Sequence, residues 1–133
     1  MNLILLFSSI TAILFLSPIN TCAQDTDLSQ AKSNFEIGDS LIDADQYDKA
    51  MKHYRQALTI SRESNKEADI ARALHKIGNV YHNQEQEQYD KALEYYQKAL
   101  SINQKMGEEA EVASNLAHIG HVHYNQKQYD KAM

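Results

Sequence analysis

The sequence predicts an all-α protein in which antiparallel helix pairs stack on one another behind an N-terminal hydrophobic leader. The motif Gln-Tyr-Asp-Lys-Ala, followed by Met or Leu, occurs at residues 46–51, 88–93 and 128–133, at spacings of 42 and then 40 residues. Such a period is typical of repeat proteins, because a two-helix unit cannot bury its own apolar faces and stacks on its neighbours. From Asp25 onward the chain has no proline and only 4 glycines, so it can be almost wholly helical.

The N-terminal segment is predicted to be a secretory signal peptide, residues 1–23. Residues 3–19 carry no charge and are rich in Leu, Ile and Phe, and small residues end at Ala23, where we expect cleavage. No Lys or Arg precedes this run, and its length approaches the roughly 17 to 25 residues of a membrane span, so an anchor through residues 3–19 is the alternative. Lipid attachment at Cys22 is a third outcome, although the preceding residues match the usual lipoprotein pattern poorly. We therefore expect a periplasmic or secreted protein, or one held in a membrane by its leader.

Residues 24–133 are predicted to form the helical array, with units at about 28–65, 66–107 and 108–133. The first helices of the units lie around residues 37–41, 73–81 and 116–123, and each second helix is expected to open at the repeated motif. From Tyr89 to Leu100 the apolar positions step by three and four, which places them in one stripe along a helix, and the stretch from Tyr47 to Leu58 repeats the pattern.

Three glycines recur at equivalent positions within the first helices. A glycine inside a helix costs about 1 kcal/mol relative to alanine. Its recurrence at Gly38, Gly78 and Gly120 therefore indicates that a neighbouring helix approaches closely, and we expect the small alanines of the following motifs, Ala50, Ala92 and Ala132, to meet them.

These residues resemble the tetratricopeptide repeat. That repeat places a large residue, Leu-Gly and Tyr on its first helix and Ala, an aromatic residue and Ala on its second. The resemblance covers about residue 28 to the end and implies a right-handed superhelix of antiparallel helix pairs. The usual closing proline is absent and the period exceeds the common 34 residues, which is similar to the longer-helix variety of the family. The matching residues are Leu74, Ile77, Gly78, Tyr81, Ala92, Tyr96 and Ala99 in the second unit, and Gly38, Leu41, Ala50, Tyr54 and Ala57 in the first.

The resemblance also implies a concave groove lined by the first helices, with ligand contacts just before and after each glycine. Such a polar set of mixed charge suits a peptide held by hydrogen bonds and shape. The other interpretation of the same positions is a set of solvated helix faces. A clamp for a peptide's terminal carboxylate, as in some family members, is not expected, because position 121 is histidine and the neighbouring lysines are missing. Carried over by position, the lining is Lys32, Phe35, Asp39, Arg72, His75, Asn79, His82, Asn83, Ser114, Ala117, His121, Tyr124 and Asn125.

Other classes of site find little support. His118, His121 and His123 are close in sequence, but the first and last fall on different sides of the predicted helix, so we predict no metal site and no cofactor. The sequence has no phosphate-binding loop, nucleophile elbow or His-Glu-x-x-His motif, so this part of the protein is not expected to be an enzyme. The net charge of -5 is spread along the chain without a basic stripe, which argues against a nucleic-acid partner.

The predicted function is a protein–protein interaction scaffold that binds peptides or protein surfaces outside the cytoplasm. The alternative is the N-terminal sensory region of a membrane-bound bacterial signalling protein, either a sensor histidine kinase or a helix-turn-helix regulator, whose amino-terminal parts this arrangement resembles. The third motif stops after six residues, so we expect the chain to be part of a longer protein, with a downstream kinase left open. As an isolated chain, its last helix should fray, aggregate or self-associate, since an array normally ends in a capping helix.

Overall fold

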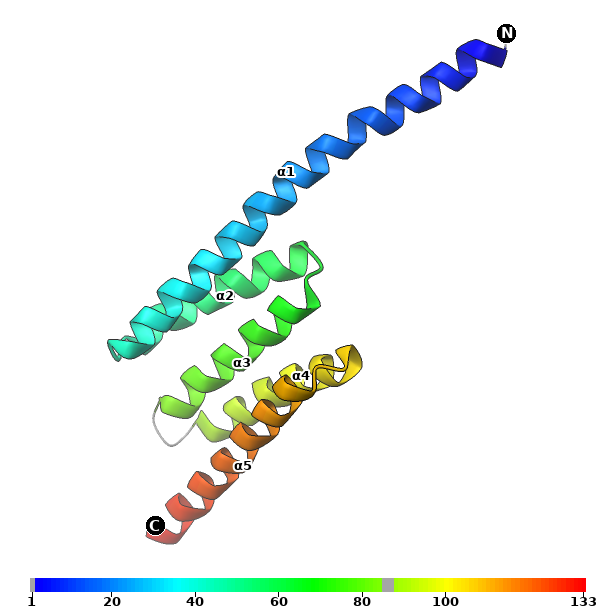
Figure 1. Ribbon diagram of the computed structural model, residues 1–133. Helices are drawn as coiled ribbons and strands as arrows, with labels where there is room; N and C mark the ends of the chain where they lie inside the picture. Colours follow the sequence, from blue (N-terminus) through cyan, green and yellow to red (C-terminus); the bar gives the residue numbers. More distant parts are fainter. Residues whose placement is uncertain (1, 85–87) are drawn as a thin grey trace.

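The computed structural model describes the backbone of residues 2–84 and 88–133, and the side chains of residues 22–23, 25–84 and 88–133. The described residues form helices joined by short turns, without a strand (Figure 1). The all-α class predicted from the sequence is confirmed. The helices are α1 (Asn2–Asp43), α2 (Tyr47–Glu63), α3 (Glu67–Asn83), α4 (Tyr89–Met106) and α5 (Glu109–Ala132).

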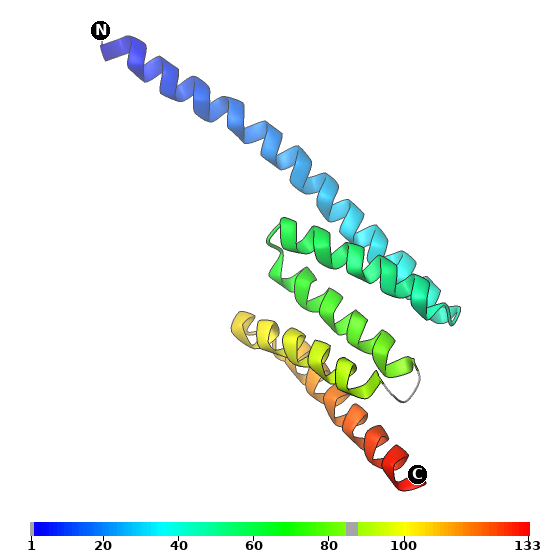
Figure 2. The same cartoon turned by 180° about the vertical axis from the view of Figure 1, so that it is seen from behind.

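The helices zigzag, so that each one packs against the next in the chain. Figure 2 shows α1 and α2 side by side, followed by α3 and then α4, with α5 crossing behind α4. The far end of α1 extends beyond the stack. The repeated motif begins α2 and α4, as predicted, and places Asp48 and Asp90 in their first turns, where the helix dipole favours a negative charge.

Three of the turns share one backbone conformation. Asp45, Asn65 and Gly107 have φ values of 56°, 53° and 73°, in the left-handed region. The amide of the following residue donates to a carbonyl five residues back, as when Gln46 bonds Leu41 at 2.8 Å and Lys66 bonds Ser61 at 2.9 Å. This is the Schellman closure of a helix, which satisfies carbonyls left free at its end. Asn and Asp tolerate the conformation better than other residues with a Cβ atom, which explains their place here.

The core consists of two clusters. The larger one joins α1 to α4 and includes the buried side chains of Phe35, Tyr54 and Ile77. The smaller one joins α4 to α5 and contains Tyr96 and Val122, each 0% exposed, together with Ala92. The aromatic and alanine positions that carry the family resemblance are therefore the ones that hold neighbouring helices together.

The recurring glycines face aromatic rings. A Cβ atom on Gly38 would lie 2.5 Å from the ring of Tyr54, and one on Gly78 would lie 2.8 Å from the ring of Tyr96. The nearest atoms at Gly38 and Gly78 therefore belong to a ring four residues further along the second helix, rather than to the motif alanines Ala50 and Ala92. Nothing described lies within 4 Å of a Cβ on Gly120. In the first two units, the absence of a side chain at the glycine therefore leaves the space that a tyrosine ring occupies.

The third motif does not open a new helix. Residues 125–132 continue α5, where the sequence predicted a turn and the start of a second helix at Tyr129. No Gly or Pro interrupts this stretch, and the six motif residues make fewer than two turns, too few to bury an apolar stripe of their own. The helical hydrogen bonding of α5 therefore continues through the third motif to Ala132.

The predicted leader, residues 1–23, falls almost entirely outside the residues whose side chains are described. Cys22 lies within them and is exposed. Within the part of the chain that was described, no helix contains an apolar stretch long enough to cross a membrane.

Candidate functional site

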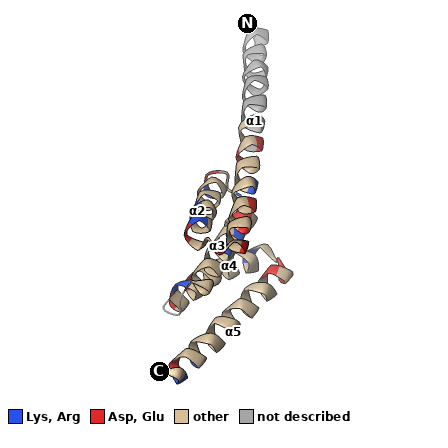
Figure 3. Ribbon diagram, turned by 90° about the vertical axis from the view of Figure 1, so that its left-hand side faces the viewer, with Lys and Arg blue, Asp and Glu red and all other residues tan. Residues whose placement is uncertain are grey.

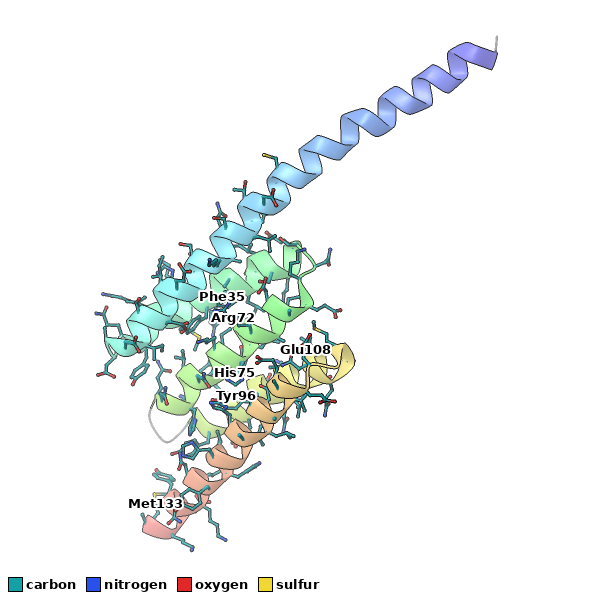
Figure 4. The ribbon with its side chains drawn as sticks, viewed as in Figure 1. Phe35, Arg72, His75, Tyr96, Glu108 and Met133 are labelled. Atoms are coloured by element: carbon teal, nitrogen blue, oxygen red, sulfur yellow. The ribbon has the colours of Figure 1, made fainter. Side chains whose placement is uncertain are left out.

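A polar hollow lies between α3 and α5. Its volume is about 570 Å³, and side chains from α3, the start of α5 and the last turn of α4 line it. In Figure 4, Arg72 and His75 mark its α3 wall and Glu108 its edge at the start of α5. The lining residues are Ala68, Asp69, Ala71, Arg72, His75, Lys76, Asn79, Asn103, Glu108, Glu111 and His118.

A smaller hollow of about 300 Å³ continues from it toward α1. The two share Lys76 and Asn79, so they form one groove across α1, α3 and α5. Asp39, Asp43 and Asn83 line the second part, with Tyr54 reaching it from α2. The first helices of the three units therefore supply most of the groove wall, as the family resemblance implied.

Asp39 lies at the junction of α1, α2 and α3. Lys76 Nζ is 2.8 Å from its carboxylate, and the hydroxyl of Tyr54 donates to the same oxygen at 2.6 Å. Burial alone would raise the pKa of Asp39, but the hydrogen bonds from Lys76 and Tyr54 and the charges of Lys76 and Arg72 outweigh it, so the pKa is lowered. Burial and the bond to Asp39 raise the pKa of Tyr54, which stays protonated and donating.

Replacing Asp39 by Asn is expected to reduce stability at neutral pH and to matter less in acid. The ion pair with Lys76 is partly exposed, so its loss should cost about 1 kcal/mol or less. Because the folded-state pKa of Asp39 lies below the ordinary aspartate value of 3.8, its contribution is complete above that value and is lost as pH falls through the folded-state pKa. Urea melts of both proteins at pH 7 and pH 3 measure this. A difference in unfolding free energy that stays constant with pH would contradict it.

Asn79 occupies the equivalent position in the second unit, directly after Gly78. Its side-chain oxygen accepts a hydrogen bond from Tyr96, as Asp39 accepts from Tyr54. Burial raises the pKa of Tyr96 as well. Asp39 and Asn79, the residues after the first two glycines, thus each orient a buried tyrosine and also line the groove.

Two residues carried over from the family pattern lie elsewhere than expected. Phe35 is 1% exposed and belongs to the core, so it does not line the groove. The guanidinium of Arg72 covers its ring at 4.3 Å from the centroid, an arrangement that holds Arg72 at the groove wall (Figure 4). Lys32 is exposed, pairs with Glu36 on its own helix at 3.9 Å, and lines neither hollow.

The predicted residues of α5 divide into two groups. Asn125 approaches His82, with its amide nitrogen 3.0 Å from the ring nitrogen, and His121 packs edge-on to the same ring. These residues therefore join α3 to α5. Ser114, Ala117 and Tyr124 line neither hollow, and Tyr124 is 61% exposed.

Sequence reasoning missed several groove residues. Lys76 and His118 lie two residues before a glycine, and Glu108 and Glu111 stand at the start of a first helix. The common position of Lys76 and His118 could have been found in the sequence, but their approach to the groove depends on the angle between α3 and α5. In the described part of the chain, no group of three His, Cys, Asp or Glu side chains is placed to hold a metal ion.

Comparison with known families agrees with this arrangement. A family model described as tetratricopeptide repeat matches residues 28–105 and again 69–133. The chain belongs to the tetratricopeptide repeat family. Such repeats generally mediate protein–protein interaction on a fold that is a non-catalytic scaffold.

A solved structure shares the fold of this tetratricopeptide repeat protein. The crystal structure of the TPR domain of Arabidopsis FLU matches with a TM-score of 0.58 at 19% sequence identity, over 79% of this chain and 92% of that one. At this identity the likeness concerns the fold alone. The search of curated proteins found no match.

Proposed function

We propose that this protein binds a peptide or a protein segment in the groove formed by α1, α3 and α5. The observation that carries this proposal is the pair of adjoining hollows, about 570 Å³ and 300 Å³, joined at Lys76 and Asn79. Polar side chains from three helices converge there, which offers an extended backbone both hydrogen-bond donors and acceptors. Repeats of this family generally bind proteins, which supports a peptide occupant.

The two walls of the larger hollow differ in charge. Arg72 and Lys76 stand on α3 together with Asp69, so that wall carries a net positive charge, whereas Glu108 and Glu111 stand at the start of α5. The guanidinium of Arg72 lies over the ring of Phe35, and it presents paired N–H donors suited to a carboxylate. A ligand with an acidic group toward α3 and a basic group toward α5 would complement both walls. Such complementarity mainly sets specificity and the association rate.

The test uses peptides selected from a random display library on the full chain. Binding of a selected peptide should weaken about tenfold or more with Arg72→Ala, because a charge-assisted hydrogen bond contributes roughly 1.5 to 3 kcal/mol. Arg62→Ala is the matched control: Arg62 is an exposed arginine at the end of α2, outside both hollows. Selected peptides that lose no affinity with Arg72→Ala or Glu111→Ala would place the binding surface elsewhere.

We also propose that this binding takes place outside the cytoplasm, on the basis of the apolar leader at residues 3–19. Mass spectrometry of the protein expressed in bacteria should find a mature chain that begins at Gln24. A chain that begins at Met1 would favour the membrane anchor, and one that begins at a lipid-modified Cys22 the lipoprotein. The sensory region of a signalling protein stays an alternative prediction, which the sequence beyond Met133 would test.

A further inference from the structure

Four histidines meet where α3 and α5 face each other. His75 of α3 packs edge-on to His118 of α5, with ring centroids 4.6 Å apart and planes at 82°. Seven residues further along α3, His82 packs in the same way on His121, at 5.1 Å and 83°. We call these four residues the histidine seam. Its two pairs lie on one face of α3, since positions seven apart are two helical turns apart.

The hydrogen bonds of the seam orient its rings, and one of them requires an uncharged ring. Asn115 donates its amide to the backbone carbonyl of Glu111 at 2.9 Å, so its oxygen is left to accept from His75 at 2.8 Å. His118 donates in the same way to the carbonyl of Ser114. At the other pair, the amide nitrogen of Asn125 lies 3.0 Å from Nε2 of His82. An amide N–H donates, so this ring nitrogen must accept, which a protonated histidine cannot do.

Few acidic groups oppose a positive charge in the seam. The groups that face His75 are His118 and Glu111 of α5, Lys76 of its own helix and the ring of Tyr96 from α4. Those that face His82 are His121 and His118 of α5 and the ring of Tyr89 from α4. Figure 3 shows the middle of α5 without Asp, Glu, Lys or Arg. Glu111 is the carboxylate whose charge favours protonation of His75, and Asp69 and Glu108 line the same hollow as His75 and His118.

Burial and the charges of neighbouring histidines both lower the pKa values of His75 and His82. Burial lowers the pKa of His75, and the charges of His118 and Lys76 add to this, against Asn115 and Glu111. Burial also lowers the pKa of His82, with His121 and His118 next. The unfolded chain therefore takes up protons at higher pH than the folded seam does. Each group favours the closed seam above the ordinary histidine pKa of 6.5 and loses that contribution as pH falls below it.

α5 packs on α4 through the smaller core cluster and meets α3 through the histidine seam. Its buried residues are Asn115 and Val122, and Leu116 is 52% exposed. Val122 packs on Ala92 and Tyr96 of α4. The contacts between α3 and α5 described above are those of the histidine rings and their asparagine partners, so the approach of α5 to α3 depends on the histidine seam.

We propose that the histidine seam is a proton-sensitive joint, which keeps α5 against α3 at neutral pH and releases it in mild acid, so that one wall of the groove moves away. Only one consequence rests on the proposed function, namely that peptide binding in the groove would be lost in acid. His75 and His118 both line the larger hollow, so their separation would open it.

The test is hydrogen exchange of the full chain at pH 7.5 and pH 5.5, with rates corrected for intrinsic exchange and with EDTA present to exclude metal ions. Protection of the amides in residues 112–124 should fall severalfold at pH 5.5, because His75 and His82 have lowered pKa values only while the seam is closed. Protection in α2 should fall by much less. Equal protection of α5 at both pH values would overturn the proposal.

Two variants and one control assign the effect to the seam. The double variant His75→Gln/His82→Gln removes both groups whose pKa values burial lowers and should abolish most of the pH dependence. Asn125→Asp places a carboxylate beside His82, which should allow its protonation with the helix closed. His123→Gln, an exposed histidine of the same helix outside the seam, should behave as the wild type. A pH effect that survives in the double variant, or disappears in His123→Gln, would overturn the proposal.

A direct reading of the ring protonation covers the case in which the double variant unfolds. In the wild type, nuclear magnetic resonance titration should place the pKa values of His75 and His82 below that of exposed His123, and the α5 resonances should shift over the same pH range. If the histidines of the seam take up protons without any change in the α5 resonances, the proposal that the seam releases α5 is overturned. These measurements use no ligand, so their outcome does not depend on whether the protein binds peptides. Conversely, an α5 that does not move with pH would not contradict peptide binding at neutral pH.

Discussion

Replacing Tyr96 by alanine is expected to destabilise the protein by about 3 to 5 kcal/mol, as for other large buried aromatic side chains. Tyr96 is fully buried and its ring fills the space above Gly78. It also packs against Val122 and stands 5.3 Å from the ring centroids of both His75 and His118. The substitution would therefore leave a cavity where α3, α4 and α5 meet. Chemical denaturation followed by circular dichroism measures the loss.

Tyr124→Ala is the control for this experiment. The two tyrosines have the same chemistry, but Tyr124 is 61% exposed, so its removal should change the free energy of unfolding by no more than about 0.5 kcal/mol. Tyr96→Phe separates the hydrogen bond to Asn79 from the packing and should cost about 0.5 to 1.5 kcal/mol. Equal unfolding midpoints for Tyr96→Ala and Tyr124→Ala would show that the second core cluster does not hold the array together.

The second large effect is expected at Gly78. A Cβ atom there would lie 2.8 Å from the ring of Tyr96, which is fully enclosed and cannot turn away. Gly78→Ala should therefore suffer an overpacking cost of about 1 to 3 kcal/mol. Against this stands the gain of about 1 kcal/mol that alanine brings to a helix interior.

Gly120→Ala isolates the two contributions. Gly120 occupies the equivalent position in α5, but a Cβ atom there meets nothing within 4 Å among the described residues. We expect this variant to be more stable than the parent by about 1 kcal/mol, from helix propensity alone. The difference between the two variants then measures the clash with Tyr96. If both alanines stabilise the chain equally, the ring does not require the glycine.

Much of the fold could be predicted from the sequence because it depends on short-range patterns. The stripes around Ala92 and Ala99 specify a helix that is buried on one side, and the repeated motif marks where α2 and α4 begin. The last repeat shows where this reasoning ends. Its motif equals the other two in sequence, yet residues 128–132 continue α5, because a helix start also requires a surface on which the new helix can pack.

The candidate site was predictable in part. The pattern placed Arg72, His75 and Asn79 along the groove, and all three line the larger hollow. It also placed Phe35 there, although that ring is buried beneath Arg72. A position on a helix face follows from periodicity alone, whereas the depth of a side chain depends on how closely the next helix approaches.

The sequence by itself determined the all-helical class, the repeat, the starts of the second helices and the face of each first helix that carries the glycine. These features follow from helical periodicity and from steric limits on a few residues. Only the tertiary structure decided that tyrosine rings occupy the glycine positions, that Asp39 bridges Lys76 and Tyr54, and that histidines of α3 and α5 form pairs. Those contacts join residues many positions apart, and the packing angles between helices set them.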